Sequence, residues 1–138
     1  MTQTTLNGSC LCGAVKYVVS GEAKRFYHCH CSRCRKATGT GHASNLFLQP
    51  GTLKWITGED QVRAFKVPEA QRFTNTFCGL CGGRVPRQMK GTDIVMIPAG
   101  SLDVEAPIAP QARIFGGSRA RWSCADDSAP VYEEYAPQ

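Results

Sequence analysis

Hydrophobic and polar residues alternate in several short stretches of this chain. In AVKYVVS, residues 14–20, the hydrophobic Val15, Tyr17 and Val19 occupy every second position. A period of two is typical of a β-strand that buries one face. Five other stretches have the same strand-like character: SNLFLQ at 44–49, LKWIT at 53–57, QVRAFKV at 61–67, QRFTNTF at 71–77 and DIVMIPA at 93–99. We therefore expect a mostly β protein built of short strands.

Turn-forming residues separate these stretches, since the chain has 14 glycines and 8 prolines. Pro50-Gly51 and Gly58 predict breaks between strands. One short stretch, SRCRKATG, fits a helix with Ser32 as its N-cap and Gly39 as its stop signal. The tail VYEEYAPQ at 131–138 fits either a short helix or a final strand.

Composition sets the protein class. A chain of 138 residues, 42% of them hydrophobic, is expected to form one folded domain over residues 1–138. No apolar run approaches the roughly 20 residues that span a bilayer, and no basic-then-apolar segment opens the chain, so we expect a cytoplasmic protein. The net charge is +5, but the Lys and Arg residues are scattered along the chain and form no basic cluster. We therefore expect no nucleic-acid partner.

The cysteine pattern points to metal. Eight cysteines without an export signal favour metal ligation over disulfides. In FCGLCGG, Cys78 and Cys81 can bind one ion from a tight, glycine-rich turn. A structural zinc site takes four ligands, and Cys10 and Cys12 in GSCLCGA are the natural second pair. The alternative for Cys78 and Cys81 is a redox dithiol, although no βαβ pattern surrounds them.

A second group lies in YHCHCSRCRK. If residues 28–31 are extended, Cys29 and Cys31 share one face and His28 and His30 share the other. The turn into the following helix can then bring Cys34 to the cysteine face. Three ligands leave a tetrahedral ion one open position, which is typical of a catalytic zinc site.

Other residues could complete or flank this second group. His28 or His30 could turn toward the ion, or Cys124 could reach it; otherwise the histidines are hydrogen-bonding residues near the sheet and Cys124 is a free thiol. His30 is the acid–base candidate, because imidazole suits proton transfer near neutral pH. Arg33, Arg35 and Lys36 could bind the carboxylates of a glutathione-like thiol, or could form a solvated helix face.

The ordered motifs resemble a known family. GSCLCGAVKY, YHCHCSRCRKATG, FCGLCGG, PAGSLD and PQARIFGGSRARW, read from Gly8 to Tyr135, are similar to the motifs of the glutathione-dependent formaldehyde-activating enzyme family, which includes centromere protein V-like domains. The resemblance implies a β-tent fold of small antiparallel sheets held by zinc. It implies two zinc ions, one structural on Cys10, Cys12, Cys78 and Cys81, and one exchangeable and catalytic on Cys29, Cys31 and Cys34.

The resemblance also implies a reaction, the reversible addition of glutathione to formaldehyde to give S-hydroxymethylglutathione. We therefore expect a zinc-dependent carbon–sulfur lyase-like enzyme that acts on a small thiol and an aldehyde. The alternatives are a non-enzymatic zinc-binding module that interacts with a protein or nucleic acid, and a sensor that binds the adduct without turnover. Exposed β-edges predict a homodimer.

Overall fold

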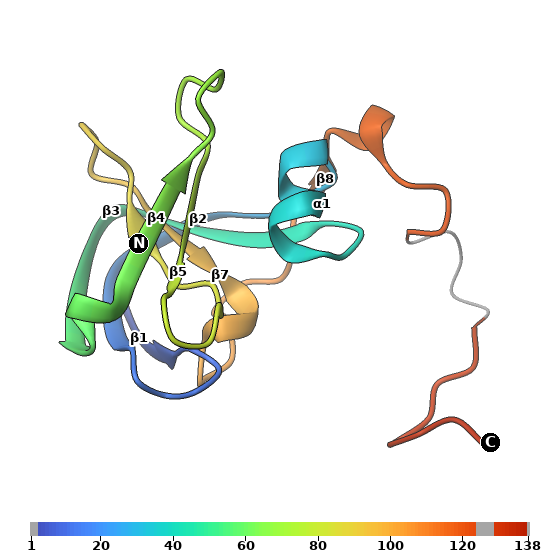
Figure 1. The fold of residues 1–138 in the computed structure, drawn as a ribbon, viewed down its shortest axis with the longest axis horizontal. Helices are drawn as coiled ribbons and strands as arrows, with labels where there is room; N and C mark the ends of the chain where they lie inside the picture. Colours follow the sequence, from blue (N-terminus) through green and yellow to red (C-terminus); the bar gives the residue numbers. More distant parts are fainter. Residues whose placement is uncertain (1–2, 124–128, 138) are drawn as a thin grey trace.

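The computed structural model describes residues 3–123 and 129–137 (Figure 1). Its strands are β1 (Gln3–Ser9), β2 (Lys16–Cys29), β3 (Ala43–Thr57), β4 (Val62–Lys66), β5 (Thr74–Cys78), β6 (Arg87–Gln88), β7 (Val95–Pro98) and β8 (Ala112–Ile114). The helices are α1 (Ser32–Thr38) and the 3₁₀ turns η1 (Glu59–Gln61), η2 (Ala99–Ser101) and η3 (Gly116–Ser118). The predicted mostly β fold, with one short α-helix at the CHCSRC motif, is confirmed.

The larger sheet is built around two long strands. Its order is β1-β2-β3-β7-β6, with antiparallel neighbours, and β8 adds a short parallel pairing to β2. Because β3 occupies one side of β2, the other side is shared: β1 pairs with residues 16–22 and β8 with residues 27–29. A separate two-stranded sheet consists of β4 and β5. The strand β2 therefore carries the chain from the first cysteine motif to the second.

The predicted break at Pro50-Gly51 is wrong, since β3 runs through it. Gly21 of β2 pairs with Gly51, whereas Ala23 pairs with Leu48. One residue of β2 therefore faces two residues of β3, which is a β-bulge. Pro50 lies in this bulge, where the missing amide hydrogen does not interrupt the ladder. Two expected strands thus join into one of 15 residues.

The main core lies on one face of this sheet, as the alternation in residues 14–20 predicted. Tyr17 and Val19 are buried with Leu46, Leu48 and Ile97. The strand β1 was missed because its sequence, QTTLNGS, has one large hydrophobic residue, Leu6. It is fixed instead by its full pairing with β2 and by the close approach of Gly8 to the Tyr17 ring.

Helix α1 has a different N-cap from the one predicted. The side chain of Cys31, rather than Ser32, accepts the amide hydrogen of Cys34, so Cys31 is the N-cap. Gly39 ends the helix in the left-handed conformation, at φ 73°, as predicted.

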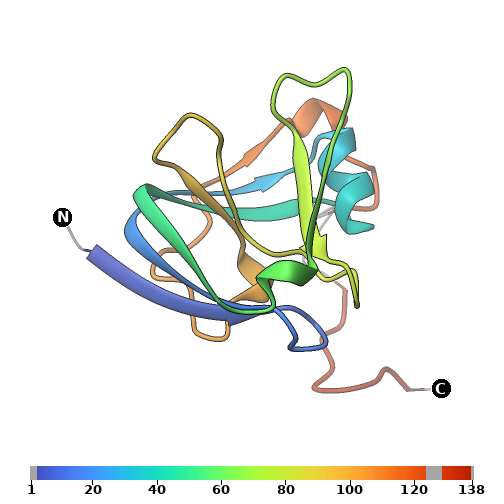
Figure 2. The ribbon, with the colours of Figure 1, turned by 60° about the vertical axis from the view of Figure 1, so that its left-hand side comes forward.

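The second sheet is a hairpin, and it projects from the body of the protein (Figures 1 and 2). Phe65 pairs with Asn75, and Lys66 pairs with Thr74. Since neighbouring strand residues point to opposite faces, these two pairs mark two different faces of the hairpin.

The tail prediction is wrong, since residues 131–137 contain neither helix nor strand. Cys124 lies outside the described residues. Within the ranges described, no helix has the length and apolar character to cross a membrane.

Candidate metal centres and the pockets beside them

The first cysteine group brings together two distant parts of the chain. The sulfurs of Cys10, Cys12, Cys78 and Cys81 all lie within 4.8 Å of one another. The Cys10 and Cys12 sulfurs are 3.7 Å apart, and those of Cys12 and Cys78 are 4.0 Å apart. Zn–S bonds of about 2.3 Å at tetrahedral angles would place neighbouring sulfurs about 3.8 Å apart. The four cysteines therefore fit one tetrahedral zinc ion, as their spacing predicted.

Backbone amides surround these sulfurs. The amides of Val15, Leu80 and Gly83 donate to the sulfurs of Cys10, Cys78 and Cys81 respectively, over 3.3–3.4 Å. The bond from Gly83, followed by one from the Cys12 backbone, lowers the pKa of Cys81 to about 6. Such bonds stabilise thiolates and orient metal ligands.

The second group forms where β2 meets α1. The sulfurs of Cys29, Cys31 and Cys34 lie within 4.8 Å of one another, and Cys29 and Cys34 are buried. Burial, and then the neighbouring Cys29, raise the pKa of the Cys34 thiol. A cation held among these sulfurs would offset that effect by favouring the thiolate. The three cysteines that the sequence grouped thus fit one metal ion.

The two histidines of the motif stay outside this group. Within residues 3–123 and 129–137, no histidine nitrogen or carboxylate oxygen joins the three sulfurs. The rings of His28 and His30 instead gather around His42, with centroids 4.0 and 5.3 Å from it. The expected separation of cysteines and histidines onto two faces is therefore observed.

His30 is 0% exposed, which is unusual for an imidazole. Its Nδ1 lies 3.1 Å from the carbonyl oxygen of Gly41. Since a carbonyl only accepts, Nδ1 carries the proton and donates, and Nε2 is the acceptor nitrogen. Nε2 is buried and has no hydrogen-bond partner among the described residues. The ring is thus a fixed, buried base with one free lone pair.

The three basic residues of α1 divide into two sets. Arg33 and Lys36 are exposed and line a pocket of about 320 Å³, together with Phe65, Phe73 and Asn75. Arg35 does not line this pocket, and its buried Nε has no hydrogen-bond partner in the described part of the chain. Residues 33 and 36 lie one turn apart on a helix, so they share a face that excludes residue 35.

This pocket adjoins the second cysteine group. Phe73, one of its lining residues, packs against the cluster that contains Cys29, Cys34 and Ala43. A ligand seated beside Arg33 and Lys36 would therefore lie close to the three sulfurs.

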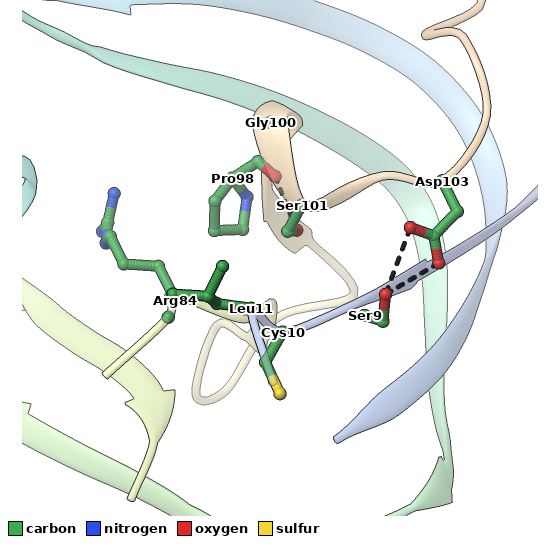
Figure 3. Close-up of a pocket in the computed structure, with 9 residues that line it drawn as sticks. Ser9, Cys10, Leu11, Arg84, Pro98, Gly100, Ser101 and Asp103 are labelled. Atoms are coloured by element: carbon green, nitrogen blue, oxygen red, sulfur yellow. Dashed lines mark hydrogen bonds between the residues drawn. The ribbon is translucent and has the colours of Figure 1, made fainter. Parts of the chain in front are cut away.

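A second pocket, of about 550 Å³, adjoins the first cysteine group (Figure 3). Its walls include Cys10, Arg84 and Ser101, and Ser9 donates a hydrogen bond to the Asp103 carboxylate at its edge. The side chain of Arg84 extends away from the other labelled residues, and its guanidinium lies at the left of the view (Figure 3).

Arg84 connects the two pockets. Its Nε donates to Oδ1 of Asn75 over 2.8 Å, so an Arg84–Asn75 pair stands between them. Burial lowers the pKa of the Arg84 guanidinium, while the Cys34 sulfur acts in the opposite direction. Arg84 is therefore a half-buried cation within electrostatic reach of the second cysteine group.

Sequence reasoning missed Arg84, Asn75, Phe73 and His42. None of them belongs to a spaced motif, because they come from the hairpin, the loop after Cys81 and the turn before β3. The proximity of Arg84 to FCGLCGG was the one available signal.

Comparisons with known proteins show the family to which the chain is similar. Residues 5–118 match the family model described as glutathione-dependent formaldehyde-activating enzyme. A protein of Halomonas elongata, provisionally named a glutathione-dependent formaldehyde-activating enzyme, is 34% identical over 116 residues, which cover 77% of this chain and 71% of that one.

A crystal structure of a Rhodobacter sphaeroides protein superposes with a TM-score of 0.54 at 20% identity, covering 78% of this chain and 99% of that chain, and supports the fold. The family match spans most of the chain and includes both cysteine groups. The chain belongs to the glutathione-dependent formaldehyde-activating enzyme family.

Proposed function

We propose that this protein catalyses the reversible addition of a small thiol, glutathione or a close relative, to formaldehyde or another small aldehyde. In the reverse direction it acts as a carbon–sulfur lyase. The observation that carries the proposal is the second cysteine group, in which three sulfurs are arranged for a metal ion and no fourth protein ligand joins them in the described residues.

The two cysteine groups have different roles in this proposal. Zinc on Cys10, Cys12, Cys78 and Cys81 is structural, because four ligands close its coordination. Zinc on Cys29, Cys31 and Cys34 is exchangeable and supplies one element of chemistry: a coordinated thiol is held as its thiolate at neutral pH.

The reaction balances without any further reagent. The substrate sulfur forms a bond to the aldehyde carbon, the carbonyl π electrons move to oxygen, and that oxygen takes up one proton. The proton released by the thiol supplies the balance. His30, the imidazole between Cys29 and Cys31 in the chain, is the group we assign to hold and return this proton.

Charged residues near the second group would bind and orient the substrate. Arg33 and Lys36 face the pocket and would bind the carboxylates of a glutathione-like thiol. Arg35 is left out of this set, since it does not line the pocket. Arg84 is a positioning residue, because its charge acts on the Cys34 sulfur.

The test is an exchange measurement, because thiols and aldehydes also react without a catalyst. NMR with ¹³C-formaldehyde and glutathione would give the exchange rate between free and adduct carbon as a function of protein concentration. We expect the rate to rise linearly with zinc-loaded protein and to return to the uncatalysed value in Cys31→Ser.

The Cys31→Ser variant is well suited to this test. Serine is a strong N-cap, so the substitution keeps the cap of α1 while removing a metal ligand. Lys54→Ala, an exposed charge on β3, is the matched control and should retain the full rate.

Two outcomes would favour the alternative functions. A protein with both sites loaded that binds the adduct saturably and leaves the exchange rate unchanged is a sensor. One that binds neither thiol nor adduct is a zinc-binding module. A homodimer and a cytoplasmic location stay predictions.

A further inference from the structure

A third pocket, separate from the two already described, lies between the β4–β5 hairpin and the β6–β7 turn. It has a volume of about 240 Å³. Four cationic side chains line it, and the amide of Gln71 is also present at its wall; the cations are Lys66, Arg72, Arg87 and Lys90. Among the described residues, no acidic side chain lines it.

The hairpin separates this pocket from the pocket beside the second cysteine group. Phe65 and Asn75, which pair across the hairpin, line the pocket next to α1. Lys66 and Thr74, the adjacent pair, line the cationic pocket. Alternation along β4 and β5 therefore gives the hairpin one aromatic face and one cationic face.

The positive charge in this pocket has no acidic partner in the portion of the chain that the structure describes. The one ion pair found there joins Lys24 to Glu22, far along the sequence from the pocket. Like charges gathered around a small volume repel one another, and an anion at their centre would remove that repulsion.

Arg87 is the most informative of the four cations. Its Nε is buried and has no hydrogen-bond partner among the described residues. Burial, and then the charge of Arg84, lower the pKa of its guanidinium. A buried guanidinium nitrogen without an acceptor is costly, since burying a polar group without a hydrogen bond costs free energy. An anion in the pocket would supply the acceptor.

Lys66 is already positioned at the wall. Its Nζ donates to the carbonyl oxygens of Ala70, over 2.6 Å, and Val67, over 3.2 Å. An ammonium group has three hydrogens, so one is left for a ligand. The hydroxyl of Thr74 donates to the Arg72 carbonyl, and is therefore not a free donor.

We propose that this pocket binds a phosphate-bearing small molecule. Four cations exceed what a single carboxylate needs, whereas a phosphomonoester carries a charge of about −1.5 to −2 and three acceptor oxygens. Arginine forks match phosphate oxygens in pairs. The volume is below the roughly 300–1,000 Å³ of sites for drug-sized ligands, so it suits a compact group.

The test uses inorganic phosphate and pyrophosphate as probes, measured by calorimetry on the zinc-loaded protein in a chloride buffer at constant ionic strength. We expect saturable binding at one site. Lys90→Glu and Arg72→Glu, both at exposed positions of the wall, should each weaken binding by at least about tenfold, the effect of losing one charge-assisted hydrogen bond.

The controls distinguish binding at this pocket from a general effect of the protein's net charge. Lys54→Glu changes the net charge by the same amount at an exposed position of β3 that does not line the pocket, and it should leave the affinity within about twofold, because salt screens exposed charges. Arg87→Lys keeps the charge but loses the fork, and we expect weaker binding with an unchanged melting temperature.

The proposal would be overturned by the absence of saturable phosphate binding, by equal weakening in Lys54→Glu and Lys90→Glu, or by binding of long nucleic acid alone. Displacement of phosphate by glutathione would also overturn it, because the pocket would then belong to the thiol site. Cys31→Ser should bind phosphate with normal affinity. Failure of the phosphate-site proposal would therefore be distinguishable from failure of the proposed function.

Discussion

Arg84 and Asn75 form a hydrogen bond of 2.8 Å, from a guanidinium nitrogen to an amide oxygen, in the wall between two pockets. The bond joins the loop after Cys81 to the hairpin strand β5. It holds a half-buried cation within electrostatic reach of the Cys34 sulfur. The second cysteine group is therefore influenced by a residue that belongs to the segment of the first.

This relationship predicts a specific kinetic effect of Arg84→Gln. Removing the cation takes away its coulombic stabilisation of the Cys34 thiolate, since a nearby positive charge favours the charged form of a thiol. We expect kcat for thiol addition to fall about tenfold or more, with little change in KM. In cobalt-substituted protein, the thiolate-to-cobalt absorption should shift as well. Lys54→Gln serves as the control, and an unchanged absorption spectrum would contradict the role given to Arg84.

The two cysteine groups should differ in their effect on stability. Cys78→Ser removes a ligand from the site that joins two distant segments, and zinc affinity at such a site is folding free energy. We expect a loss of several kcal/mol and a melting temperature lower by more than about 10 °C. Cys31→Ser should lower zinc content by one ion and change the melting temperature far less. Equal destabilisation by both variants would show that both sites are structural.

His30 can be tested through its two nitrogens separately. In His30→Asn the side-chain amide can replace the Nδ1 donor to Gly41, while the acceptor at Nε2 is lost. We expect turnover to fall by about 10²–10⁴ with a nearly normal melting temperature. His30→Leu loses both functions and should also lower the melting temperature. Near-normal turnover in His30→Asn would show that His30 has only a structural role, its hydrogen bond to Gly41.

Stability should depend on pH through Tyr17. Burial raises the pKa of Tyr17 to about 12, above its ordinary value near 10. A group whose pKa is raised on folding contributes stability that is fully present below the unfolded pKa, and that stability is lost as pH rises through the folded pKa. The free energy of unfolding should therefore decrease between about pH 10 and 12. Urea titrations of Tyr17→Phe should lack this decrease, whereas the exposed Tyr132→Phe should keep it.

Gly8 is expected to tolerate no side chain. A Cβ there would meet the Tyr17 ring and come within 2.6 Å of the Ser101 carbonyl oxygen. Gly8→Ala should cost about 1–3 kcal/mol of unfolding free energy, as overpacked cores do. At Gly100 a Cβ meets no heavy atom within 4 Å, so Gly100→Ala is the matched control. Equal melting temperatures for the two variants would rule out the close contact.

Sequence spacing was sufficient to assemble both cysteine groups. The C-x-C and C-x-x-C pairs are local, and the need of a structural zinc ion for four ligands was enough to join Cys10 and Cys12 to Cys78 and Cys81. Alternation also placed Cys29 and Cys31 away from His28 correctly, because it depends on one short extended segment.

Sequence reasoning failed where the decisive contact was distant. Ser32 is the better N-cap by propensity, but the Cys31 sulfur occupies that position because it lies with its two partner sulfurs. The strand β3 passes through Pro50 because a bulge formed with β2 accommodates it. The position of Arg84 follows from the hairpin, which no local pattern describes.

The two-faced hairpin has a consequence for changes in chain length. Inserting or deleting one residue within β4 or β5 would turn every following side chain to the opposite face. Aromatic rings would then line the cationic pocket, and Lys66 would point toward α1. A change in the turn between the strands, residues 67–73, would leave both pairings intact. Both strands must therefore keep their residue count, whereas a change in the length of the turn would displace Arg72 and Phe73 from the two pockets without exchanging the faces of the hairpin.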